Sequence, residues 1–122
     1  MKQYQINSAY EALVSLASFK LPAKTSYNIW KIAKKIEESH SFYEQQKLKY
    51  IESHNGTIST DGRVTFNSAD DENLFVKDMN DLINLDVELD IHPVVVSLDD
   101  FGNQSISMKD IARLDGFVEF ID

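Results

Sequence analysis

The chain has 122 residues, the size of one domain, and its 43% hydrophobic content is sufficient for a single core spanning residues 1–122. It has no cysteines, which excludes disulfides and thiolate metal sites, and no run of about 18 apolar residues that would predict a membrane span. The formal net charge of -8 is uneven: residues 1–56 carry eight Lys and five acids (+3), whereas residues 57–122 carry four Lys or Arg and fifteen acids (-11). Because phosphates would repel this acidic part, direct nucleic-acid binding is not expected.

The N-terminal residues predict a short strand followed by a helix. Residues 2–6 alternate polar and apolar side chains, with Tyr4 and Ile6 on one side, which is typical of a half-buried strand. Apolar residues then recur at helical spacing over residues 7–19, and we expect this helix to end before Pro22.

A long second helix is predicted over residues 25–54. This stretch lacks Pro and Gly, and Asn55-Gly56 follows as a left-handed stop. A helix of this length, roughly 43 Å, is too long for a chain of 122 residues to cover completely. We therefore expect its distal half to project or to pair with another chain. The apolar positions that form one continuous stripe are Ile29, Ile32, Ile36, Tyr43 and Tyr50.

A β-hairpin and a third helix follow. The β-prone runs 57–60 and 63–66 flank Asp61-Gly62, a pair typical of a two-residue hairpin turn. Ser68 is the expected N-cap of a helix over about 69–84 that begins with carboxylates. Its expected buried face consists of Leu74, Phe75, Met79, Leu82 and Ile83.

The C-terminal third predicts short strands and one short helix. Residues 87–98 alternate until Pro93, which indicates an edge strand or two strands joined by a kink. A helix from Ser107, ended by Gly116, precedes a last strand over 117–121. The predicted fold class is α+β: a helical hairpin with one long helix (25–54), a third helix (69–84) and a small, mainly antiparallel sheet.

Residues 20–35 contain five of the twelve basic residues and the one tryptophan. On a helix, Tyr27, Trp30, Lys31 and Lys34 would share a face, and aromatic residues beside cations are typical anchors of protein interfaces. Ordinary helices also place Lys stems over apolar surface. Both interpretations, a protein-binding face and simple packing, therefore stay open.

Candidate catalytic and metal-binding patterns are weak. Glu37 and His40 form one Glu-x-x-His motif, whereas a di-iron bundle needs two such motifs. No nucleophile elbow or Gly-rich phosphate loop is present, so we expect a noncatalytic protein without a cofactor. An alternative binding surface is an acidic face, able to imitate a nucleic acid, formed by Asp70, Asp71, Glu72, Asp78 and Asp81.

The segments KLPAKTSYNIWKIAKKIEE, FYEQQKLKYIESHNG, LFVKDMNDLINLDVELDI and SMKDIARLDGFVEFID together resemble a family of small uncharacterised phage and prophage proteins. The resemblance implies a viral origin, an α+β fold and a location in the cytoplasm of the infected host or on the virion. It also implies action by binding another protein, as a particle assembly factor or as an inhibitor of a host defence or nucleic-acid enzyme. Self-association through the long helix is a further expectation.

Overall fold

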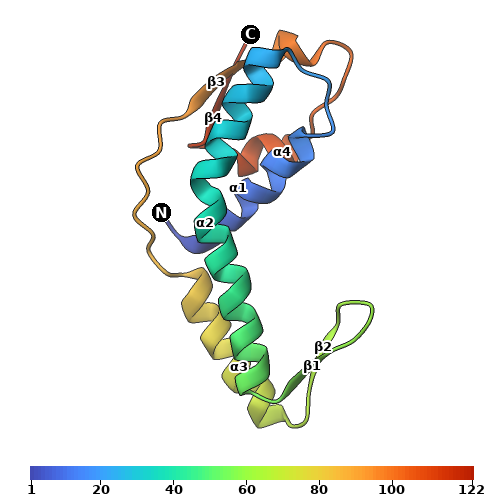
Figure 1. The fold of residues 1–122 in the computed structure, drawn as a ribbon, viewed down its shortest axis with the longest axis vertical. Helices are drawn as coiled ribbons and strands as arrows, with labels where there is room; N and C mark the ends of the chain where they lie inside the picture. Colours follow the sequence, from blue (N-terminus) through green and yellow to red (C-terminus); the bar gives the residue numbers. More distant parts are fainter.

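The computed structural model describes all of residues 1–122, which form four α-helices, a 3₁₀-helix and four short strands (Figure 1). The predicted α+β class, the long helix and the third helix are confirmed. No helix combines the length and apolar character required to cross a membrane. In chain order the elements are α1 (Gln3–Leu16), α2 (Ala23–Ser53), β1 (Gly56–Ile58), β2 (Val64–Phe66), α3 (Ala69–Ile83), β3 (Val94–Ser97), η1 (Leu98–Phe101), α4 (Met108–Arg113) and β4 (Val118–Ile121).

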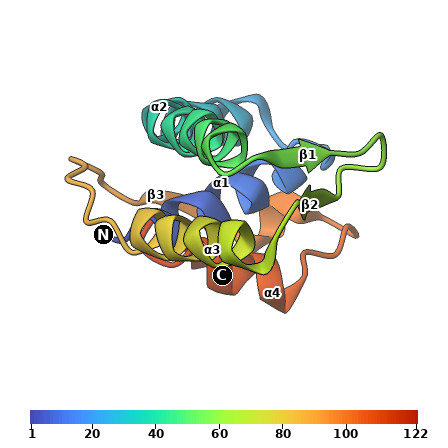
Figure 2. The same ribbon diagram turned by 90° about the horizontal axis from the view of Figure 1, so that it is seen from below.

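Helix α2 runs along most of the long axis of the molecule (Figure 1). Its 31 residues span about 46 Å. We call the upper part, built by α1, residues 23–39 and residues 94–121, the body. The lower part, where residues 40–53 of α2 lie beside α3 and the hairpin, is the arm. Viewed from below, α2 and α3 lie side by side and the hairpin extends to one side of them (Figure 2).

The core lies entirely in the body. Ile29, Ile32 and Ile36 of α2 are buried and pack with the apolar face of α1. These residues are three or four apart, so a single stripe of α2 faces α1. The cluster comprises Ile6, Ala9, Ala12, Leu13, Leu16, Ile29, Ile32, Ile36, Val96, Phe101, Leu114, Phe117 and Val118.

The predicted N-terminal strand is wrong, because α1 already begins at Gln3. Only Lys2 makes a β-bridge, to Asp86. Ile6 is buried whereas Tyr4 is exposed, so the two do not share a face. Ile6 continues the helical spacing of the apolar residues that follow it, and burial of that longer stripe outweighs a five-residue alternation.

The hairpin is confirmed, with a different turn. Thr57 pairs with Thr65, and the backbone N–H of Ser59 donates to the Arg63 carbonyl at 2.8 Å, which leaves a loop of three residues rather than two. Gly62 takes a φ of +85°, as the last residue of such a three-residue loop requires. At the end of α2 the left-handed residue is Asn55, with φ +59°.

The arm is more thinly packed than the body. Ile51 of α2 and Leu82 of α3 are its only buried residues. Of the predicted inner face of α3 only Leu82 is therefore buried, and Leu74 is half exposed. A contact between His54 Nε2 and Asp78 Oδ2 at 2.6 Å joins the two helices near the hairpin.

The expected small sheet consists of two separate pairs. One is the antiparallel hairpin; the other is the parallel pair β3–β4, in which Val94 lies opposite Val118. Helix α4 lies in the connection between these two strands, as a parallel crossover requires. Residues 87–93 join no strand, so pairing starts only after Pro93, which lacks a backbone N–H.

We expect Ile36→Ala to lower the free energy of unfolding by about 2–5 kcal/mol, because Ile36 is completely buried and its removal leaves a cavity. Urea unfolding monitored by circular dichroism measures this change. The control is Leu74→Ala, which removes an exposed apolar side chain from α3 and should change stability by less than about 0.5 kcal/mol. Equal losses in the two variants would contradict the assignment of the core.

Candidate protein-binding face on the long helix

Three of the four residues predicted for a protein-binding face come together on the outer side of α2. The rings of Tyr27 and Trp30 stack with their centroids 6.0 Å apart and an interplanar angle of 20°. Both side chains are more than half exposed, at 57% and 56%. The Lys31 Nζ atom lies 4.8 Å from the centre of the Tyr27 ring, a cation–π contact. The face thus presents two large aromatic surfaces and one cation to solvent.

Lys34, the fourth predicted residue, is engaged within its own helix. Its Nζ atom donates to Glu37 Oε2 at 2.7 Å. The hydrogen bond to this carboxylate, and then its charge, raise the pKa of Lys34. Both side chains are about half exposed, so the pair is screened by solvent and contributes little to stability. A partner carrying a carboxylate could therefore compete with Glu37 for Lys34.

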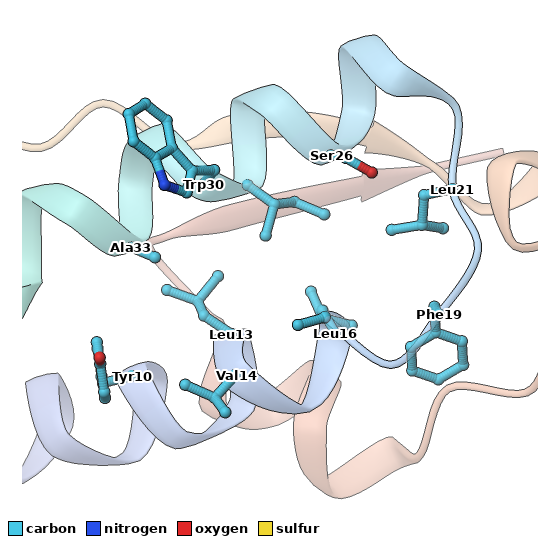
Figure 3. A pocket seen from close by; sticks show the side chains of 11 residues that line it. Tyr10, Leu13, Val14, Leu16, Phe19, Leu21, Ser26, Trp30 and Ala33 are labelled. Atoms are coloured by element: carbon cyan, nitrogen blue, oxygen red, sulfur yellow. The ribbon is translucent and has the colours of Figure 1, made fainter.

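An apolar groove lies directly beside Trp30, and the sequence alone does not reveal it. The groove has a volume of about 370 Å³, and ten of its eleven lining residues are hydrophobic. Figure 3 shows the side chains of α1, of α2 and of their connection around it. They include Tyr10 and Val14 of α1, Phe19 and Leu21 of the connection, and Trp30 and Ala33 of α2.

The connection between α1 and α2 is held by a residue far away in sequence. The Gln104 side chain accepts from the Lys20 N–H and donates to the Lys20 carbonyl, both at 2.7 Å. These two bonds satisfy the backbone N–H and C=O groups of Lys20 and fix the connection at this residue. Phe19 and Leu21, on either side of Lys20, are thereby kept at the end of the groove.

The start of α2 is attached to the same part of the body. The Thr25 hydroxyl donates to Asp100 Oδ2 at 2.5 Å, which ties the first turn of α2 to η1. Thr25 is buried although it is polar, and this bond satisfies its hydroxyl. The end of the groove wall nearest the connection is thus positioned by contacts with Asp100 and Gln104.

The residues of the predicted acidic face lie along α3, and most of them serve the helix itself. Ser68 caps α3 by accepting from the Asp71 N–H at 3.1 Å, which confirms the predicted cap. Asp70, Asp71 and Glu72 occupy the first turn, where the positive end of the helix dipole stabilises carboxylates. Asp78 is bound to His54, and Asp81 makes no ion pair.

Glu37 and His40, the residues of the single Glu-x-x-His motif, have separate partners. Glu37 is bonded to Lys34, whereas the His40 ring stacks on Tyr10 with a centroid distance of 4.3 Å. His40 Nε2 is 3.8 Å from Glu44 Oε1. Nowhere does the structure gather three or more His, Asp or Glu side chains in an arrangement suited to a metal ion.

No protein-family model, curated protein or solved structure matches this chain. The resemblance to phage and prophage proteins accordingly stays a prediction that rests on the sequence segments quoted above.

The pKa of Tyr43, one turn beyond His40, makes the stability of the protein depend on pH in a way that tests the partial burial of this side chain. Burial, followed by the charges of Glu44 and Glu11, raises the pKa of Tyr43 above its ordinary value of 10.0. Because the pKa of Tyr43 is higher in the folded state than in the unfolded state, the protonated hydroxyl stabilises the fold. This stabilisation is complete at a pH below the unfolded-state pKa and is lost as the pH rises through the folded-state pKa. We expect Tyr43→Phe to reduce the loss of stability between about pH 8 and about pH 11, measured as the urea midpoint. The same decrease in both proteins would contradict the burial of this hydroxyl.

Proposed function

We propose that the protein acts without catalysis, by binding another protein through the face formed by Tyr27, Trp30 and Lys31 and the groove beside it. The observation that supports this proposal is the position of two stacked, half-exposed aromatic rings at the edge of an apolar groove. Buried aromatic anchors surrounded by polar groups contribute most of the binding energy in protein interfaces. Trp30 is exposed and also lines the groove, so its ring and the groove form adjoining apolar surface that a partner could cover.

The charges around this face indicate the chemistry of the partner. Lys31 lies on the ring of Tyr27, and Lys34 is held only by an exposed pair with Glu37. A partner segment with an apolar side chain for the groove and carboxylates beside it would match both features. Binding of this kind weakens as salt is added, because the exposed charges are screened.

The biological setting that we propose follows from the resemblance to phage and prophage proteins. Particle assembly is the role we favour, because it requires a small protein that binds other chains and performs no chemistry. The site of action would be the cytoplasm of the infected host or the virion. Inhibition of a host enzyme through the acidic face of α3 is supported less well. Its Asp78 is occupied by His54, and the carboxylates in the first turn stabilise the helix.

We expect Trp30→Ala to weaken binding of the partner by roughly thirtyfold or more, the usual cost of truncating a central aromatic anchor. The measurement compares the proteins retained from an extract of the producing cells by immobilised wild-type and variant chains, with mass-spectrometric quantification. Phe42→Ala is the matched control, since Phe42 is an exposed aromatic residue of the same helix outside the groove. If Trp30→Ala retains the same proteins as wild type, the proposed face is not the binding site.

A further inference from the structure

A second stripe runs along α2, distinct from the one that packs on α1. We call it the outer stripe. Its members are separated alternately by three and four residues, the spacing that keeps a seam facing a second helix. All are exposed except Glu37, which is partly exposed. The outer stripe consists of Tyr27, Trp30, Lys34, Glu37, Ser41, Glu44 and Leu48.

The outer stripe matches a copy of itself that runs in the opposite direction. When two such helices are aligned antiparallel about a point near residue 39, Trp30 lies opposite Leu48 and Lys34 lies opposite Glu44. Near the two-fold axis, Glu37 then lies opposite Ser41. The apolar side chains of Trp30 and Leu48 thus meet and each Lys34 meets a carboxylate, whereas Tyr27 lies opposite Ile51, which is buried within its own chain. A parallel alignment would instead place Lys34 against Lys34 and Glu44 against Glu44, and like charges repel.

The charge distribution of the folded chain favours the same orientation. Lys24, Lys31 and Lys35 are exposed on the half of α2 in the body, whereas the acidic α3 lies beside the half in the arm. Residues 23–39 of α2 carry four Lys and two Glu, whereas α3 carries five acids and one Lys. An antiparallel pair brings α3 of each copy toward the lysine-rich half of α2 in the other, whereas a parallel pair places the two lysine-rich halves together.

From these observations we infer that the first partner of the binding face is a second copy of this chain, paired antiparallel along the outer stripe. The inference rests on the proposed function and names the partner of that same face. The contact is isologous: Trp30 of each copy packs on Leu48 of the other, at the edge of the groove, and the interface closes on itself as a dimer.

The composition of the outer stripe also sets the strength of the pair. Leu48 is 55% exposed and Trp30 is 56% exposed, so both have apolar surface to bury. The middle of the stripe is polar, with Glu37 of each copy opposite Ser41 of the other. Polar residues at seam positions fix alignment at a cost in stability. The dimer is therefore concentration-dependent and weakened by salt.

The absence of cysteines permits a direct test of orientation. Lys34→Cys and Glu44→Cys chains are mixed and oxidised. In the antiparallel pair the two positions face each other, and a mixed disulfide should form. Residues 34 of the two copies are then about 15 Å apart along the helix, too far for a disulfide. Each variant oxidised alone should therefore remain uncrosslinked, whereas homodisulfides equal to or in excess of the mixed product would overturn the antiparallel arrangement.

A charge reversal tests the same contact in the absence of cysteine. Light scattering over a range of concentrations should show that Glu44→Lys weakens dimerisation by roughly tenfold or more, because two like-charged contacts replace two attractive ones. Glu88→Lys makes the same change on an exposed residue outside the outer stripe and should leave the dimer unaffected. Circular dichroism establishes that both variants are folded. A wild-type chain that is monomeric at every concentration, or equal weakening in both variants, would overturn the inference.

These outcomes separate the inference from the proposed function. Glu44→Lys leaves Tyr27, Trp30 and the groove intact, so a monomeric variant can still retain another protein from the extract. A monomeric wild-type chain whose capture of another protein is lost in Trp30→Ala would refute the dimer and retain the function. A Trp30→Ala chain that changes neither dimerisation nor capture would refute both.

Discussion

Burial of Ile29, Ile32 and Ile36 against α1 is the interaction on which the rest of the molecule depends. These side chains lie at the centre of the core, and full burial of each contributes about 1.5–3 kcal/mol. They are spaced so that α2 can face α1 in one rotational setting only. That setting determines which residues of α2 remain in solvent, and so it places Tyr27 and Trp30 on the outer side.

The length of α2 creates the second constraint. The body covers only the first half of the helix, and the arm covers one side of the remainder with a single helix and a hairpin. Ile51 and Leu82 alone are buried there, and the arm is held together by partly buried contacts such as the Phe66–Phe75 ring pair and the contact between His54 and Asp78. Because α2 is longer than the core that packs against it, one side of the helix stays exposed along its length. Another chain could cover this exposed side.

Local periodicity accounts for the elements that could be predicted from the sequence. The long helix is recognisable because 32 residues without Pro or Gly, residues 23–54, precede Asn55, and the cap of α3 follows from Ser68 and the carboxylates after it. Residues 2–6 were misleading because five residues fit both a strand and the first turns of a helix. The parallel pairing of β3 with β4 depends on a crossover through α4, which no local pattern encodes.

The proposed binding face also combines a part that the sequence predicts and a part that depends on the tertiary structure. Tyr27, Trp30 and Lys31 share a helix, so their proximity follows from spacing alone. The groove could not be predicted, because it depends on how α1 and α2 are joined. Gln104, which holds that connection, is 84 residues away from Lys20. Sequence patterns thus identified the cation and the rings, whereas only the tertiary structure supplied the apolar hollow beside them.

Trp30 belongs both to the groove and to the outer stripe, and this double role has a functional consequence. A second copy whose Leu48 covers Trp30 would compete with any other protein for the same ring. The two equilibria are then linked, and each lowers the apparent affinity of the other. If the proposed dimer forms, the chain at low concentration would be a monomer with an exposed binding face, and pairing would cover that face as the concentration rises. For a protein that assists assembly, such competition would confine binding of the other partner to the interval before the dimer dominates, and it would do so without any change in fold.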